Sequence, residues 1–178
     1  MGGSSSLFAR IKMSRLACDK WLSSAIRHVP DYFDWHEMNP TAAAFQHELN
    51  DPGAKLDYMS VGEYLETLAD SSRFFCCEFD DDESAFFIAD AQMDGGLSGI
   101  SRLAAFLAAL RGAETFKDDD GPSFIYVFHA LEGGDPDALL RIRRGESLFL
   151  RATDPSPDVL YFINEAEEFI ETLAEDEE

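Results

Sequence analysis

The sequence predicts an α+β fold: a single layer of about five mostly antiparallel strands with helices packed on it, including N-terminal and C-terminal helices. Hydrophobic residues make up 46% of the 178 positions, which is enough for a well-packed core. Short β-like segments joined by turn sequences predict two hairpins. Segments with helical periodicity precede, separate and follow these hairpins. We expect one domain over residues 1–178, because no internal linker divides the chain.

Residues 4–29 are interpreted as one amphipathic N-terminal helix that ends at Pro30 and lies at the periphery of the domain. Its apolar stripe comprises Leu7, Ile11, Cys18, Leu22, Ala25 and Val29. A further helix is expected after Asn39-Pro40, a cap followed by a helix-starting proline. Ser60 and Glu63 have capping-box spacing and predict a helix start. The inward residues of that helix would be Val61, Tyr64, Leu65 and Leu68.

The segments "RFFCCEF" and "SAFFIADA", joined by "DDDE", predict an antiparallel hairpin with an acidic tip. The apolar helix "LSGISRLAAFLAALRG" follows, with Gly112 as its expected C-terminal cap. The segment "SFIYVFHAL" is apolar on both faces, so a central strand is expected there. A second hairpin should turn at Arg144-Gly145, and Ser156-Pro157 should begin the last helix.

The chain is strongly acidic: 35 Asp and Glu face 14 Lys and Arg, and the formal net charge is −21. Such a charge disfavours nucleic acid and anionic lipid and favours a basic protein partner. The plain alternative is a salt-adapted or simply acidic protein. No apolar run is long enough to span a membrane.

The charge is unevenly distributed along the chain. Residues 1–29 hold five bases and one acid, whereas residues 154–178 hold ten acids and no base. We therefore expect the N-terminal segment to pair electrostatically with the last helix, within the chain or across a dimer. The opening "MGGSSS" also fits an N-myristoylation pattern, a targeting segment, or an extension before a start at Met13. The continuous apolar stripe favours the structural helix over these alternatives.

Two acidic runs are the candidate partner-binding loops. Their residues are Asp80, Asp81, Asp82, Glu83, Asp118, Asp119 and Asp120. Neither run has the alternating ligand spacing of a calcium loop, so we expect no metal there. The alternative interpretation is that both runs are simply solvated loops.

No arrangement of residues typical of catalysis is recognisable. The four histidines lack metal-ligand spacing, and neither a serine-nucleophile elbow nor a phosphate-binding glycine loop occurs, so neither cofactor nor metal is expected. The three cysteines, two of them adjacent, form no disulfide framework and favour a reducing, cytoplasmic location. If the protein were an enzyme, His129 and Asp90 would be the first place to look. Alternation places Arg141 and Arg143 on one strand face, but no helix start supports a phosphate site beside them.

In its small size, acidity and lack of catalytic motifs, the chain resembles bacterial toxin-immunity proteins. Residues 60–175, ending in "LYFINEAEEFIETLAEDEE", are also similar in element order to class I type III secretion chaperones. The first resemblance implies a non-catalytic inhibitor that neutralises a basic toxin. The second implies an adaptor that holds a partner segment. The adaptor is expected to be a homodimer, whereas the inhibitor is compatible with a monomer or a homodimer. An enzyme of unrecognised type is the remaining alternative.

Overall fold

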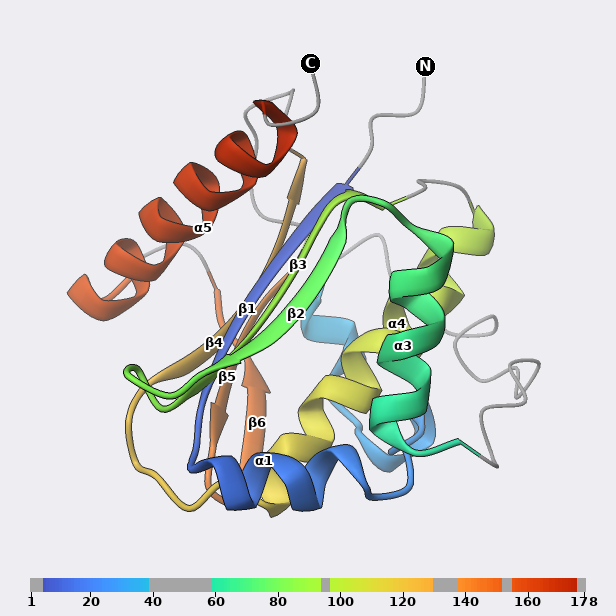
Figure 1. Cartoon of the computed structure of the whole chain (residues 1–178), viewed down its shortest axis with the longest axis vertical. Coiled ribbons are helices and arrows are strands. Elements are labelled where there is room, and N and C mark those ends of the chain that lie inside the picture. Colours follow the sequence, from blue (N-terminus) through green and yellow to red (C-terminus); the bar gives the residue numbers. More distant parts are fainter. Residues whose placement is uncertain (1–4, 39–58, 94–96, 130–137, 152–154, 176–178) are drawn as a thin grey trace.

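A six-stranded antiparallel sheet forms the centre of the computed structural model, which describes residues 5–38, 59–93, 97–129, 138–151 and 155–175 (Figure 1). The spatial order of its strands is β2-β3-β1-β4-β5-β6. The strands are β1 (Ser5–Lys12), β2 (Phe75–Asp80), β3 (Ala85–Met93), β4 (Ser123–His129), β5 (Ala138–Arg143) and β6 (Glu146–Phe149). The helices are α1 (Arg15–Leu22), α3 (Val61–Ser71), α4 (Leu97–Arg111) and α5 (Pro157–Glu175). Short 3-10 helices are η1 (Val29–Asp31), η2 (Trp35–Glu37) and η4 (Gly112–Thr115). The predicted fold class is confirmed.

The sheet separates two apolar layers. On one face, α5 packs over β1, β3 and β4 (Figure 1). Its buried residues are Val159, Phe162, Ala166 and Ile170, which meet Phe8, Phe124 and Tyr126 of the sheet. The other face is covered by α1, α3 and α4 (Figure 1). That larger layer includes Leu7, Ile11, Trp21, Leu65, Leu107 and Ile125. Among the described residues, no helix is long and apolar enough to cross a membrane.

The prediction of one helix over residues 4–29 is wrong. Its first part is β1, which lies between β3 and β4 in the middle of the sheet rather than at the periphery. Only Arg15–Leu22 is α-helical, and Ser14 caps this helix by accepting the backbone N–H of Ala17 at 3.2 Å. The six-strand count exceeds the expected five because this segment supplies an additional strand.

The error has a physical cause in the burial of β1. Leu7, Ala9 and Ile11 are buried in the larger layer, and Phe8 is buried under α5. A strand that is buried on both faces shows a run of apolar residues instead of alternation, and periodicity alone cannot separate such a run from a helix. The buried Arg10 interrupts the run and is the only charged side chain within it.

Predictions that depended on local signals are confirmed. Strands β2 and β3 form a hairpin, and β5 and β6 form another with Gly145 at φ +74° in its turn. The capping box of α3 is present, with Ser60 and Glu63 each accepting the other's backbone N–H. Helix α5 begins at Pro157, and β4 is the central strand that was expected to be covered on two sides.

Gly112 does not cap α4 as predicted. The chain continues directly into η4, and Gly112 is buried where a Cβ would lie 3.1 Å from the Cγ of Arg27. Close packing against Arg27, and not a left-handed conformation, therefore favours a glycine at this position. The helix expected after Asn39-Pro40 lies outside the described residues.

Arg111 joins the end of α4 to the far edge of the sheet. Its side chain is 1% exposed, forms a 2.8 Å ion pair with Asp34, and donates hydrogen bonds to the hydroxyl and carbonyl oxygens of Ser147, both at 2.7 Å. Its guanidinium also lies 4.0 Å from the ring centre of Tyr32 and 5.2 Å from that of Trp35. A buried cation therefore fastens the 29–37 segment, α4 and β6 together.

Candidate functional site

The first acidic loop is the turn between β2 and β3. A carboxylate oxygen of Asp80 accepts the backbone N–H groups of Asp82 and Glu83 at 2.8 and 2.9 Å. Ser84 has a positive φ of 48°, and its carbonyl accepts the N–H of Met13 at 3.0 Å. These hydrogen bonds fix the backbone of the loop, so the Cα positions of its acidic residues are defined.

Two basic side chains, one at the end of β1 and one at the start of α1, contact this first loop. Arg15 donates two hydrogen bonds to Asp81, at 2.8 and 2.6 Å, and its guanidinium lies over the ring of Phe79 at 4.5 Å. The hydrogen bonds lower the pKa of Asp81 and raise that of Arg15. Lys12 lies 3.7 Å from Glu83. The carboxylates of Asp81 and Glu83 keep 71% and 52% of their side-chain surface exposed, so both stay accessible to a partner.

The second acidic loop precedes β4 and is fixed at the same junction. The Asp118 carboxylate accepts hydrogen bonds from the Ser14 hydroxyl and, at 2.9 Å, from the Ser14 backbone N–H. These bonds lower the pKa of Asp118. The buried Lys117 donates to the carbonyl of Lys12 at 2.6 Å, and burial lowers its pKa. Arg144 donates to the Asp118 carbonyl at 2.7 Å.

The remaining acids of the second loop are more open. Asp119 accepts the backbone N–H of Gly121 and lies 3.7 Å from Lys117. Asp120 is 89% exposed and lies 3.8 Å from Arg144. Asp119 keeps 48% of its side-chain surface exposed, so both carboxylates remain accessible to solvent and to a partner.

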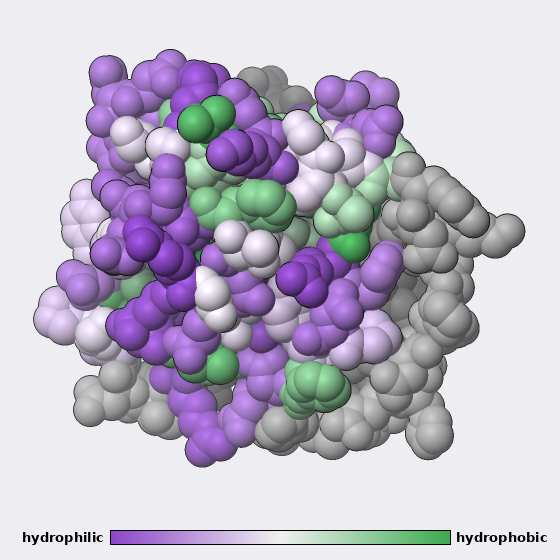
Figure 2. Space-filling model, turned by 90° about the horizontal axis from the view of Figure 1, so that it is seen from below, coloured by the Kyte–Doolittle hydropathy of each residue, from purple (hydrophilic) through white to green (hydrophobic). Residues whose placement is uncertain are grey.

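The structure therefore brings the two predicted loops together at one end of the sheet. Both loops are bonded to residues 12–15, the junction between β1 and α1. Hydrophilic side chains cover most of the described surface at the α1 end of the molecule, with hydrophobic ones scattered among them (Figure 2). The sequence indicated the acids but not Ser14, Lys12 and Arg15 as the residues that position them. Their only sequence signal was the local excess of bases.

The expected pairing between the N-terminal bases and the last helix occurs, although the base lies on β1 rather than on a helix. Arg10 forms a 2.6 Å salt bridge with Glu165 of α5. Burial raises the pKa of Glu165 more than the nearby Arg10 lowers it. The outer surface of α5 keeps exposed carboxylates at Glu167, Glu168 and Glu171.

The described residues offer little for catalysis. They contain no group of three or more His, Cys, Asp or Glu that could hold a metal ion. Burial raises the pKa of Cys18 to about 12 and also raises the pKa values of Cys76 and Cys77, so these thiols are poor nucleophiles near neutral pH. Asp90 lies on β3 and His129 ends β4, with β1 between the two strands. The side chain of His129 lies outside the described part of the structure.

No family model, curated protein or solved structure matches this chain. The resemblances to immunity proteins and secretion chaperones therefore stay predictions.

Proposed function

We propose that the protein is an acidic, non-catalytic binding domain that inhibits a basic partner protein, as an immunity protein neutralises a toxin in the cytoplasm. The observation that carries this proposal is the position of the two acidic loops, which are fixed side by side by residues 12–15 at one end of the sheet. The net charge of −21 adds a long-range negative electrostatic potential to that of the two loops.

The hydrogen bonding within the loops supports a binding role. Asp80 and Asp118 use their carboxylates to hold backbone, and this leaves Asp82, Asp119 and Asp120 exposed on loops whose course is already set. A partner would then meet carboxylates on ordered loops. These loops would lose less conformational entropy on binding than mobile loops would. Electrostatic attraction of this kind chiefly raises the association rate and makes binding sensitive to salt.

The direct test is titration calorimetry with the protein encoded by the adjacent reading frame, at low and at physiological salt. We expect a one-to-one complex that weakens as salt rises. The double variant Asp82→Asn, Asp120→Asn should weaken binding by roughly tenfold, because partly buried interface charges contribute on the order of 1 kcal/mol or more. These residues are chosen because neither side chain makes a close hydrogen bond among the described residues.

A charge-matched control is available on α3. Glu66 and Asp70 are exposed there, and the double variant Glu66→Gln, Asp70→Asn removes the same two charges away from the loops. We expect this control to change the affinity less than about twofold. If both double variants weakened binding equally, the loss of affinity would follow from net charge alone. That result would contradict a specific role of the loops. Absence of any complex at low salt would contradict the proposal itself.

An adaptor that holds a partner segment is the second candidate function. The observation in its favour is that α5 packs over β1, β3 and β4, while Leu148 on the edge strand β6 stays 38% exposed. Of the other exposed large hydrophobic residues, three lie on α5, one lies on α1 and one lies between η1 and η2. They are Leu16, Phe33, Leu160, Tyr161 and Phe169. Sedimentation analysis distinguishes the two functions. The adaptor should form a homodimer through its exposed apolar surface, and the inhibitor does not require a dimer.

A further inference from the structure

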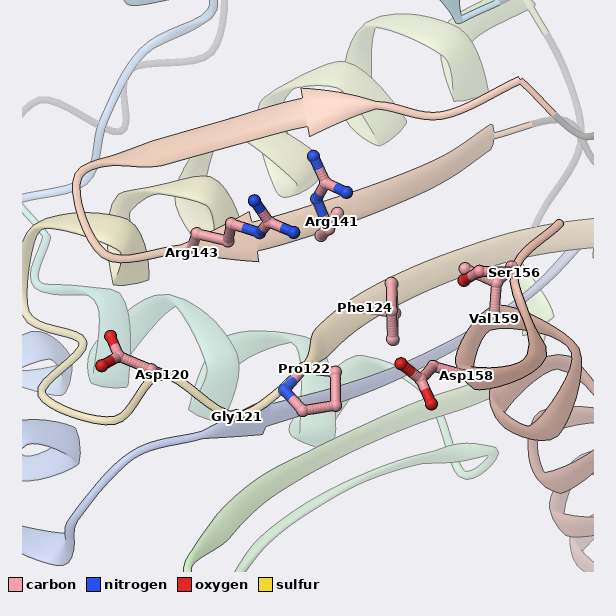
Figure 3. Close-up of a pocket in the computed structure, with 9 residues that line it drawn as sticks. All are labelled: Asp120, Gly121, Pro122, Phe124, Arg141, Arg143, Ser156, Asp158 and Val159. Atoms are coloured by element: carbon pink, nitrogen blue, oxygen red, sulfur yellow. The ribbon is translucent and has the colours of Figure 1, made fainter.

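A cavity of about 200 Å³ lies on the α5 side of the sheet, apart from the larger apolar layer. It is bounded by residues 120–122 of the second acidic loop and the start of β4, by β5, and by the beginning of α5 (Figure 3). Phe124 lines it from β4, Arg141 and Arg143 from β5, and Ser156 and Val159 from the beginning of the helix (Figure 3). Three segments distant in sequence thus converge on one polar pocket.

The two arginines are the unusual feature of this cavity. Arg141 pairs with Phe124 across the strands, and Arg143 lies two residues further along the same face. Their guanidinium groups lie beside one another in the close-up (Figure 3). Within the described residues, neither side chain has a hydrogen bond or a salt bridge, whereas Arg10, Arg15 and Arg144 all reach carboxylates. Two adjacent cations repel each other, and no carboxylate of the described residues is paired with either of them, although Asp120 and Asp158 line the same cavity. An anion between the two guanidinium groups would reduce that repulsion.

The first turn of α5 adds donors to the same cavity. Leu160 makes the first backbone hydrogen bond of the helix, to the carbonyl of Ser156 at 3.0 Å. The N–H groups of Asp158 and Val159 precede it, and in the described part of the chain no acceptor is bonded to them. Free N–H groups and the positive end of the helix dipole both favour an anion at this position. The sequence suggested the arginine pair but could not place a helix start beside it.

We propose that this cavity binds the phosphate group of a small molecule. Arg141 and Arg143 would each donate to the phosphate oxygens, and the Ser156 hydroxyl and the Val159 N–H would contact it from the helix side. Asp120 and Asp158 also line the cavity, and their negative charges compete with the phosphate for the arginines (Figure 3). This inference does not depend on the proposed inhibition of a basic partner, although Asp120 of the second acidic loop also lines the cavity.

The test is ¹⁵N-detected NMR titration of the full chain with inorganic phosphate and with O-phosphoserine, using potassium chloride at matched ionic strength as the control. We expect saturable shifts of the Asp158 and Val159 amides with phosphate but not with chloride. Stronger binding of O-phosphoserine would assign the site to a phosphate monoester, and equal binding would assign it to the free ion. No saturable shift at about 10 mM of either probe, the limit of weak specific binding, would overturn the proposal.

Two substitutions of opposite expected sign sharpen the test. The double variant Arg141→Gln, Arg143→Gln should weaken phosphate binding at least tenfold, because it removes both cationic donors. Asp158→Asn should strengthen binding several-fold, because a competing carboxylate is lost. Arg151→Gln is the matched control, since Arg151 is 75% exposed, pairs with Glu37 and does not line the cavity. Unchanged binding in the double variant, or weaker binding in Asp158→Asn, would contradict the assigned geometry.

Discussion

Two arginine sites on opposite faces of the sheet differ in how their charge is balanced. Arg111 is enclosed: it has an ion pair with Asp34, two hydrogen bonds to Ser147, and aromatic rings around its guanidinium. Arg141 and Arg143 line a solvent-accessible cavity and have none of these partners among the described residues. The chain carries 35 acids, so the difference arises from position and not from a shortage of carboxylates.

The comparison separates cations that hold the fold from cations that are available to a ligand. A guanidinium that is 1% exposed must be balanced internally, because a buried charge without a partner costs several kcal/mol. Arg141 is only half-buried and Arg143 is exposed, so water can solvate both charges in the absence of a ligand. Substitution of Arg111 should therefore lower the free energy of unfolding, whereas substitution of Arg141 and Arg143 should not.

The largest expected effect is that of Arg111→Ala. The substitution leaves the Asp34 carboxylate without its partner, leaves Ser147 without its donor, and opens a cavity among Tyr32 and Trp35. We expect a loss of about 3 kcal/mol in the free energy of unfolding, at the lower end of the range for breaking a buried pair, because Asp34 is 23% exposed. Urea denaturation followed by circular dichroism measures it.

The matched control for this variant is Arg151→Ala. Arg151 also pairs with an acid of the 29–37 segment, Glu37 at 2.8 Å, but it is 75% exposed. Its substitution should cost less than about 1 kcal/mol, as exposed salt bridges usually do. Comparable losses in both variants would show that burial does not distinguish these arginines.

The Arg10–Glu165 pair is intermediate, with side chains that are 10% and 30% exposed. Burial raises the pKa of Glu165, so the folded state holds this proton more tightly than the unfolded chain does. This contribution to stability is complete below the ordinary pKa of glutamic acid and is lost as the pH rises through the raised folded value. Wild type should therefore lose stability relative to Glu165→Gln over that interval.

Urea denaturation of wild type and Glu165→Gln at several pH values between about 4 and 8 measures this difference. The control is Glu167→Gln, because Glu167 is exposed on the same helix. We expect the stability difference between wild type and the control to stay flat over the interval. A flat difference for Glu165→Gln as well would show that Arg10 fully offsets the burial of Glu165.

The features that the sequence predicted correctly are those encoded by neighbouring residues. The capping box of Ser60 and Glu63, the turn at Gly145 and the start of α5 at Pro157 each depend on a few adjacent positions. Strand β1 was missed because its identity depends on what covers both of its faces, which is a long-range property.

The candidate sites divide in the same way. The acids of both loops and the shared face of Arg141 and Arg143 were apparent from composition and alternation. The bond between Ser14 and Asp118 joins residues 104 positions apart, so no local pattern indicates it. The approach of the α5 start to Arg141 likewise depends on how α5 packs on the sheet, which is a tertiary property.

The smallest expected effect is that of Arg141→Gln combined with Arg143→Gln on stability in phosphate-free buffer. No hydrogen bond or salt bridge within the described structure is lost, and the repulsion between two adjacent cations is relieved. The free energy of unfolding should therefore change by no more than about 0.5 kcal/mol, as for surface positions outside special features. Urea denaturation measures this change, with Arg144→Gln as a control that does remove a hydrogen bond, to the Asp118 carbonyl. A loss above about 2 kcal/mol in the double variant would mean that these arginines hold the fold as Arg111 does.

Added phosphate should raise the unfolding midpoint of wild type but not that of the double variant, because only a folded protein with an intact site gains stability from the ligand.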